Sequence, residues 1–202
     1  MRDTRDRLID AARALMTERG VLEVSIAEIT QRAEANVALV SYHFNGREGL
    51  MLAVAEADAT LTLADLDRLV AADLSASDTI RRHITAIIRV YGQRPYLNRL
   101  LQKLLREGTH EVARHVADLF SRPIAIARRQ IINAGIAAGE FRVVEPDLVS
   151  IAIDGACAQI FTSPEAREAV LGDSRMSDGL LERYAASTAE LIIAGLMAHP
   201  PG

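Results

Sequence analysis

The sequence predicts an all-α protein in which a three-helix unit containing a helix-turn-helix precedes a larger helical bundle. Apolar residues recur every three or four positions through most of the 202 residues, and no segment alternates in the manner of a strand. Half of the residues are hydrophobic, yet only 4% are aromatic and Trp is absent. The core must therefore consist mainly of aliphatic side chains and Ala, a composition that favours helices.

The first helix is expected from Thr4, which can cap it, to Arg19. Its buried stripe consists of apolar residues at helical spacing, namely Leu8, Ile9, Ala12, Leu15 and Met16. Gly20 follows at the position where a helix commonly ends in a left-handed residue.

Two short helices joined by a tight turn are expected next. Ser25 and Glu28 have the spacing of a capping box, so the first of these helices begins at Ser25. Its apolar residues recur at helical spacing, namely Ile26, Ile29 and Ala33. Asn36 is a good N-cap for the second helix, residues 37–44, and Asn45 with the following glycine then turns the chain.

The second short helix is expected to have an outward face without charged residues. Val40 and Phe44 lie four residues apart and are expected in the core. The opposite face carries Ala38, Leu39 and Tyr42, with Ser41 and His43 at its flanks. Small and apolar groups of this kind approach base edges and thymine methyl groups in a major groove, which suggests double-stranded DNA as a partner.

The residues expected to contact DNA are Ser25, Asn36, Val37, Ala38, Leu39, Ser41, Tyr42, His43 and Arg47. Arg47 lies in the first turn of the next helix, where free backbone N–H groups favour a phosphate. In the alternative interpretation, Tyr42 and His43 are ordinary surface residues, and Val37 and Leu39 pack within the domain.

Bulk charge does not indicate a nucleic-acid partner. The formal net charge is -4, and residues 1–50 contain seven Arg against eight Asp and Glu, a net charge of -1. Any contact with phosphates must therefore depend on the local placement of a few arginines and helix N-termini.

The remaining chain is expected to form a series of helices separated by polar, Gly or Pro positions. A long helix from Arg47 to about Asp73 comes first, and Pro123 is expected to kink or split a later one. The other helices are expected from Ser77 or Asp78 to Tyr91, at 96–106, at 110–138, from Pro146 to Phe161, at 165–171, and from near Ser177 to about Ala198. Gly135 and Gly139 are expected to mark the end of the 110–138 helix.

The segment from Ser25 to Leu50 resembles the DNA-binding domain of the TetR family of bacterial transcriptional regulators. The matching residues are Ala33, Val40, Tyr42, His43, Phe44, Arg47, Glu48 and Leu50. Three positions depart from the usual pattern of the family: Glu34 replaces the turn glycine, Ser41 a phosphate-binding tyrosine, and Arg47 a lysine. The specific resemblance covers roughly the first quarter of the chain, and the remainder matches only as an architecture.

The resemblance implies a repressor that binds a palindromic operator as a homodimer and is released by a small-molecule effector of unknown identity. It divides the chain into a helix-turn-helix DNA-binding domain, residues 1–46, and a ligand-binding and dimerisation domain, residues 47–202. The long helix that begins at Arg47 could transmit displacement between the two domains. Candidate pocket residues are His83, Tyr91, Asn98, Gln102, Phe120 and Arg128, although most polar residues of this region are expected to be structural or exposed.

Two C-terminal helices carry more apolar surface than a small domain needs for its own core. Residues 148–161 are apolar nearly all round, and the last helix has a seam at 3-4-3-4 spacing. In the family that this chain resembles, the last two helices form a four-helix dimer interface. The expected interface residues are Ile153, Cys157, Ile160, Leu181, Tyr184, Thr188, Leu191 and Gly195. In the alternative, both helices are simply the core of one subunit.

Other classes of function find little support in the sequence. Glu107 and His110 have the spacing of a di-iron motif, and Glu111 and His115 lie nearby, but Gly108 breaks the helix and the motif occurs once. A solvated face is therefore the favoured interpretation, with a metalloprotein as an alternative. No Gly-x-Ser-x-Gly motif or phosphate loop is present, so neither an enzyme nor a cofactor is expected. A helical protein-interaction module without DNA binding is the other alternative.

The sequence also favours a cytoplasmic protein without a membrane partner. Cys157 is the single cysteine, so no disulfide framework is expected. The N-terminal segment, MRDTRDR, is charged and lacks the apolar stretch of a signal peptide. The longest apolar run, residues 148–161, is too short to span a bilayer.

Overall fold

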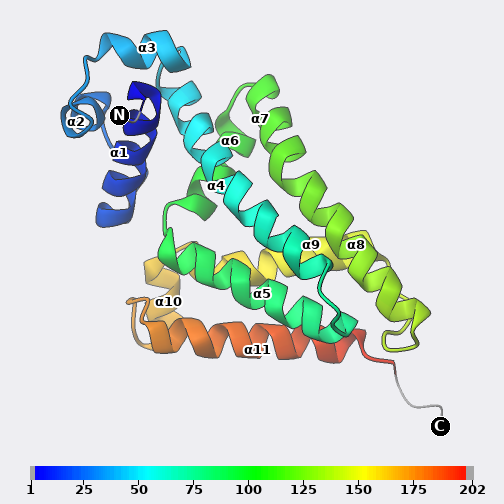
Figure 1. Ribbon diagram of the computed structural model, residues 1–202. Coiled ribbons are helices and arrows are strands. Elements are labelled where there is room, and N and C mark those ends of the chain that lie inside the picture. The colour runs from blue at the N-terminus through cyan, green and yellow to red at the C-terminus, as the bar shows by residue number, and fades with distance from the viewer. Residues whose placement is uncertain (1–2, 199–202) are drawn as a thin grey trace. The chain divides into compact units, whose positions relative to one another are not determined.

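The computed structural model of the protein describes residues 3–198, and within them helices are the only regular elements apart from one isolated bridge between Phe141 and Met197 (Figure 1). The helices are α1 Thr4–Arg19, α2 Ile26–Arg32, α3 Ala38–Phe44, α4 Arg47–Val70, α5 Ala76–Gln93, α6 Leu97–Glu107, α7 His110–Val116, α8 Arg122–Ala137, α9 Pro146–Ala158, α10 Pro164–Leu171 and α11 Asp178–Leu196. A π-helical segment, Ala117–Ser121, follows α7, and a 3-10 turn, Gln159–Phe161, follows α9. The predicted all-α fold class is confirmed.

The ends of the first two helices follow from local chemistry. Gly20 ends α1 in a left-handed conformation, with φ +64°, as predicted, whereas the N-cap is Asp3 instead of Thr4. Ser25 and Glu28 form the predicted capping box, because the Ser25 side chain accepts from the Glu28 N–H and the Glu28 carboxylate accepts from the Ser25 N–H.

Pro123 has the predicted effect, in the form of a π-helical segment. Proline has no N–H to donate to the preceding turn, and its ring crowds that turn. The chain widens to a π-helix over Ala117–Ser121 and resumes the α-helical form in α8 from Arg122. The predicted 110–138 stretch is thus two helices, α7 and α8.

Two sequence expectations about α5 and α8 were wrong in detail. Ser75, and not Ser77 or Asp78, caps α5, and its side chain accepts from the Asp78 N–H at 3.1 Å. Glu140 adds a second cap from a distant part of the chain, accepting from the N–H groups of Ala76 and Ser77 at 2.9 Å each. Gly135 does not mark the end of α8 but lies inside it, where a Cβ atom would stand 2.3 Å from the Phe141 ring.

The chain packs as two compact units. The first contains the described residues up to Thr62 together with Gln93–Ser121, and the second contains Leu63–Gly92 and the described residues from Arg122 onward. The helix α4 therefore contributes its first two thirds to the first unit and its last turns to the second. This division follows packing, whereas the predicted boundary between residues 46 and 47 concerns function and stays a prediction.

Each unit has its own aliphatic core. In the first unit, α1 to α4 bury residues that are at most 1% exposed, namely Leu8, Ala12, Met16, Ile29, Val40, Leu50 and Val54. In the second, the core is formed by residues from α5, α8, α9 and α11, among them Ile80, Ile84, Ile88, Ile132, Ile153, Cys157, Ala189 and Ile193. Within residues 3–198, no helix is both long and apolar enough to cross a membrane.

Candidate nucleic-acid interface

The turn between α2 and α3 is built on a left-handed residue. Glu34 has φ +49°, a conformation in which glycine is far more common, and the Ala35 N–H donates to the Thr30 carbonyl at 2.9 Å. The turn therefore keeps its geometry with glutamate at this position. Asn36 then caps α3, because its side-chain oxygen accepts from the Ala38 N–H at 2.8 Å.

The two faces of α3 are arranged as predicted. Val40 and Phe44 are buried, at 1% and 7% exposure, and fix the helix on the core of the first unit. The guanidinium group of Arg5 lies over the Phe44 ring, 5.5 Å from its centroid. On the outer face, Tyr42 is 81% exposed, and its ring packs edge-on against the His43 ring, with ring centroids 4.9 Å apart.

The remaining predicted contact residues differ in their exposure. Val37, Ala38 and Ser41 are exposed, whereas Leu39 and His43 are half-buried. Ser25 and Asn36 are exposed at the starts of α2 and α3, with their side chains used as caps. None of these residues is charged apart from the titratable His43, so the presented face is apolar and hydroxyl-bearing.

Arg47 has a structural partner that the sequence did not predict. Its guanidinium group donates to the carbonyl of Val24 and, at 3.0 Å, to the carbonyl of Leu22. These bonds tie the start of α4 to the connector between α1 and α2. In this structure Arg47 thus stabilises the first unit, and its contact with a phosphate stays a prediction.

Most other charges near α3 are paired within the first unit. Arg32 forms two hydrogen bonds with the Glu18 carboxylate, at 2.7 and 2.5 Å, and Arg19 pairs with Glu28 at 2.7 Å. The hydrogen bonds from the Ser25 backbone and side chain, followed by the one from Arg19, lower the pKa of Glu28 to about 2. These pairs offset two positive and two negative charges of the first unit.

The junction between α3 and α4 depends on a glycine that the sequence analysis did not single out. A Cβ atom at Gly49 would lie 1.8 Å from the carbonyl oxygen of Phe44, closer than any non-bonded contact permits. Asn45 and Gly46 adopt positive φ angles of +56° and +108° in the turn just before it. Gly49 therefore lets α4 start directly against the end of α3.

A buried carboxylate joins three segments of the first unit. Asp58 of α4 is 0% exposed. Its carboxylate accepts hydrogen bonds from Arg13 Nη2 at 2.6 Å and from the Tyr96 hydroxyl at 2.7 Å, and it forms an ion pair with Arg94 Nη1 at 3.4 Å. Burial, together with the hydrogen bond to Asp58, raises the pKa of Tyr96 far above its ordinary value. Because α1, α4 and the segment before α6 meet at this carboxylate, it fixes the scaffold on which α2 and α3 are held.

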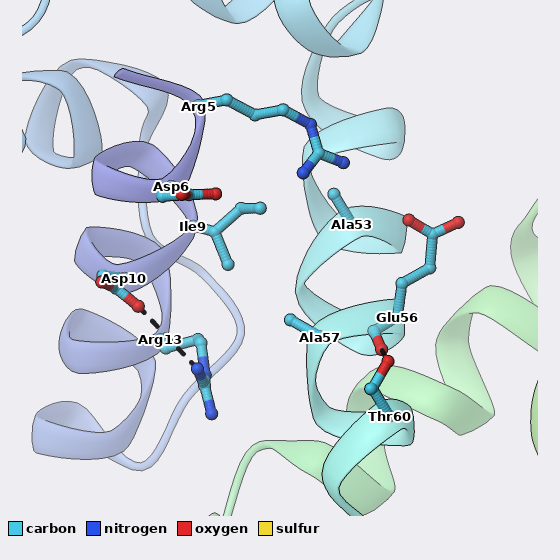
Figure 2. A pocket seen from close by; sticks show the side chains of 9 residues that line it. All are labelled: Arg5, Asp6, Ile9, Asp10, Arg13, Ala53, Glu56, Ala57 and Thr60. Atoms are coloured by element: carbon cyan, nitrogen blue, oxygen red, sulfur yellow. Dashed lines mark hydrogen bonds and ion pairs between the residues drawn. The ribbon is translucent and has the colours of Figure 1, made fainter. Parts of the chain in front are cut away.

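An open cleft of about 460 Å³ lies between α1 and α4 in the same unit. Figure 2 shows Arg5 and Arg13 extending from α1 and Glu56 and Thr60 from α4. Asp6 and Asp10 also line it, so side chains of both signs face the same space. A cleft with this mixture has no preference for one charge of ligand.

The predicted pocket residues belong to both units. His83, Tyr91 and Arg128 belong to the second unit, where His83 and Arg128 are buried and bonded to each other at 2.9 Å. Asn98 and Phe120 are buried in the first unit, where Gln102 is exposed. Which of these six candidates line a ligand pocket stays a prediction.

Half of the predicted interface residues point into the protein. Ile153 and Cys157 are 0% exposed and Ile160 and Thr188 are 6% exposed, all within or against the core of the second unit. Leu181 and Tyr184 are half-buried, and Tyr184 donates to the Ala156 carbonyl. Leu191 and Gly195 of α11 are exposed, as are Ala194 and the α9 residues Leu148, Ile151, Ala152 and Gly155. The assignment of α9 and α11 to a dimer interface stays a prediction.

The residues of the alternative metal site have partners of their own. His115 bonds Glu56 at 2.8 Å, His110 bonds Arg114 at 2.7 Å, and Glu107 pairs with Lys103 at 3.8 Å. Across residues 3–198, no group of three or more His, Cys, Asp or Glu side chains is placed to hold a metal ion.

Comparison with known proteins places this arrangement in a family. Residues 8–54 match the family model described as bacterial regulatory proteins, tetR family, and residues 73–201 match the model described as tetracyclin repressor-like, C-terminal domain. Among curated proteins, a probable HTH-type transcriptional regulator, YttP of Bacillus subtilis, is 42% identical over 48 residues, which are 24% of this chain and 23% of that protein. The regulator BetI of Brucella anthropi is 37% identical over 90 residues, 43% of this chain and 42% of BetI.

These alignments span less than half the length of the curated relatives. The whole fold is matched by solved structures. The regulator FadR of Bacillus subtilis, solved in complex with stearoyl-CoA, superposes with a TM-score of 0.75 over 96% of this chain and 99% of its own, at 17% identity. Because one family model covers the N-terminal helix-turn-helix and another covers most of the remaining chain, this protein belongs to the TetR family of bacterial regulatory proteins.

Proposed function

We propose that this protein is a transcriptional repressor that binds a palindromic DNA operator as a homodimer and is released by a small-molecule effector. The observation that carries the DNA-binding part is the outer face of α3, on which Tyr42 is 81% exposed while Val40 and Phe44 anchor the helix from behind. Residues 1–46 would form the DNA-binding domain and residues 47–202 the ligand-binding and dimerisation domain.

The outer face of α3 suits direct contact with bases more than attraction to the phosphate backbone. Ala38 can approach a thymine methyl group, and Ser41 and Tyr42 offer hydroxyl groups to base edges or nearby phosphates. The N–H groups of the first turn of α4, which follow the turn at Gly46, offer an anion site for one phosphate. Affinity would thus come from a few placed groups and from the pairing of two subunits on one operator.

Tyr42→Ala is expected to weaken operator binding about tenfold to a hundredfold, the usual cost of one specific base-contacting side chain. The loss should be confined to DNA, because the Tyr42 side chain is exposed and supports no core contact. The measurement is fluorescence anisotropy with a genomic fragment selected by the wild-type protein, beside a scrambled fragment, at two salt concentrations. Leu61→Ala, another exposed position, serves as the control and should leave the affinity unchanged.

Specific binding by the wild-type protein with a steep salt dependence would support the DNA-binding part of the proposal. If Tyr42→Ala also disrupted the dimer or the helical content, Tyr42 would be a structural residue. If the wild-type protein bound no DNA even at low salt, the protein-interaction alternative would replace the repressor.

The dimer surface that we propose is the outward face of α9 and α11. Leu148, Ile151 and Leu191 are 58%, 68% and 73% exposed, and around them lie small residues that permit close approach of a partner helix. A Cβ atom added at Gly155 or Gly195 would meet nothing within 4 Å, so both glycines face open space. An apolar face of this size on two adjacent helices suits a self-complementary contact about a two-fold axis.

Leu191→Glu is expected to weaken self-association about a hundredfold or more, because the two-fold axis places two new carboxylates in one apolar contact. The protein should become monomeric at micromolar concentration, as measured by sedimentation equilibrium, while its circular dichroism is unchanged. Leu61→Glu places the same charge on an exposed apolar position of the first unit and should leave the dimer intact. A dimer that persists in Leu191→Glu would move the interface elsewhere.

The release of DNA by an effector is proposed through α4. This helix starts at Arg47, directly after the turn that follows α3, and ends at Val70 in the second unit. A ligand that shifts the end of α4 would therefore displace the segment that holds α3. Addition of the effector would lower operator affinity, and operator DNA would lower effector affinity by the same factor.

A further inference from the structure

The second unit buries the side chain of an arginine. Arg128 of α8 is 0% exposed. Its Nε atom donates to His83 at 2.9 Å, and its Nη1 atom donates to the backbone and side-chain oxygens of Ser150, at 2.9 and 3.0 Å. Nη1 also lies 2.7 Å from a carboxylate oxygen of Asp154, whose own side chain is 60% exposed. Removing a guanidinium group from water is costly, so a full set of partners is expected around it.

That set is incomplete on one side of the guanidinium group. The Nη2 atom of Arg128 is buried and has no hydrogen-bond partner, although it carries two N–H donors. The large majority of buried side-chain polar atoms in folded proteins have a hydrogen-bond partner, and a bound water, ion or ligand is one explanation of an exception. Burial, and then the charge of Arg128, lower the pKa of His83 to about 3, so His83 is neutral and accepts from Nε. The unpaired edge is therefore cationic and buried.

The hydroxyl of Tyr91 is a second donor near Arg128. The Tyr91 ring packs edge-on against Phe161, with ring centroids 5.6 Å apart. Burial raises the pKa of Tyr91 to about 12, and Arg128 and Asp154 both lie close enough to affect it. The hydroxyl thus stays protonated and is available as a donor.

A mainly apolar cleft of about 380 Å³ lies one helical turn away along α5 and α8. Thr79, four residues before His83, and Ile131, three residues after Arg128, both line it. Its other walls include Ala134, Ala138 and Val70, the last residue of α4. A ligand in this cleft would therefore touch the helix on which the proposed release of DNA depends.

We propose that Arg128 binds the carboxylate of a small amphipathic effector, with Tyr91 as a second donor and the apolar part of the ligand in the cleft between α5 and α8. The unpaired Nη2 group selects an anion, and a carboxylate is matched by the planar guanidinium group. The cleft selects a short aliphatic or aryl tail. Because Nη2 is covered, binding requires the side chains between the cleft and Arg128 to move. The regulatory role of this ligand rests on the proposed function, whereas its binding does not.

The experiment compares acids with amides of the same shape. Binding of butyrate, hexanoate, octanoate and phenylacetate to the full chain is measured by isothermal titration calorimetry without DNA, beside the corresponding primary amides. Carboxylates are expected to bind at least tenfold more tightly than their amides, since only the charged group makes a charge-assisted bond to Arg128.

Four variants assign the preference to the proposed site. Arg128→Gln should abolish the preference for acids, and Tyr91→Phe should reduce it severalfold while leaving the core filled. Arg129→Gln is the matched control, because Arg129 is exposed and pairs with Asp147 at 2.8 Å, and it should keep the preference. Ala134→Leu fills the cleft at an exposed position, and it should weaken the binding of octanoate more than the binding of butyrate.

The proposal is overturned if no carboxylate of the series binds at millimolar concentration, if acids and amides bind equally, or if the preference survives both Arg128→Gln and Tyr91→Phe. Operator binding is measured separately with the same protein. Carboxylate binding that leaves operator affinity unchanged would overturn the regulatory role and retain the site. Loss of operator affinity on addition of an acid, but not of its amide, would support both.

Discussion

Asp58→Ala is expected to lower the free energy of unfolding by about 3–5 kcal/mol, the usual cost of removing one partner from a buried ion pair. The substitution leaves Arg13, Arg94 and the Tyr96 hydroxyl around a site that is 0% exposed in the wild-type protein. Arg13 keeps a second carboxylate, that of Asp10, with 3.8 Å between its Nη1 atom and the Asp10 Oδ1 atom. Urea denaturation followed by circular dichroism, at one fixed protein concentration, measures the change.

Two further variants make this result specific. Asp58→Asn keeps an oxygen that accepts from Tyr96 but loses the charge, so its effect should be smaller than that of Asp58→Ala. Asp65→Ala removes an aspartate from the same helix whose side chain is 64% exposed and pairs with Arg68, and it should cost less than about 1 kcal/mol. If Asp58→Ala were no more destabilising than Asp65→Ala, Asp58 would not be the centre of a stabilising network.

The role of Asp58 also illustrates what sequence reasoning could not reach. Along α4 nothing distinguishes it from exposed aspartates such as Asp65, because both stand among Ala and Leu in a long helical segment. Its partners come from elsewhere, with Arg13 45 residues before it and Tyr96 38 residues after it. A buried carboxylate is defined by such distant partners, and a local pattern does not contain them.

Features set by neighbouring residues were predicted well for the opposite reason. The capping box at Ser25 and Glu28, the end of α1 at Gly20 and the break before Pro123 each depend on a few consecutive residues, and all are present. The same holds for α3, where the spacing of Val40 and Phe44 identifies the buried face. The opposite face of a helix with one buried stripe is then exposed, so the candidate DNA-contacting surface followed from local reasoning.

The buried faces of the C-terminal helices were predicted only in part. In α9 and α11 apolar residues occupy more than one face, and periodicity cannot say which face is directed inward. The seam assigned to α11 contains Thr188, which is 6% exposed, and Leu191, which is 73% exposed. On α9, the residues expected at the surface, Ile153 and Cys157, fill the core, whereas Ile151 faces outward. Only the packing of α5 and α8 against these helices decides between the faces.

Gly49→Ala is expected to have the second large effect, a loss of about 3 kcal/mol in the free energy of unfolding together with loss of operator binding. The added Cβ atom would lie 1.8 Å from the carbonyl oxygen of Phe44. Overpacking a folded protein typically lowers its stability by about 1–3 kcal/mol. Here the atom in the way belongs to the backbone of Phe44, so the loss is expected at the upper end of this range. Relief of the clash requires α3 to move away from the start of α4.

Two measurements on this variant separate loss of stability from displacement of α3. Urea denaturation gives the free energy of unfolding, and anisotropy titration at a temperature where the variant is fully folded gives operator affinity. Gly179→Ala in α11 is the control, because its nearest neighbour would be an Arg183 nitrogen at 3.9 Å, and it should raise stability by up to about 1 kcal/mol. A folded Gly49→Ala protein that has lost operator affinity would mean that this glycine sets the position of α3. If the folded variant kept full affinity, the α3–α4 junction would not determine how α3 is presented to DNA.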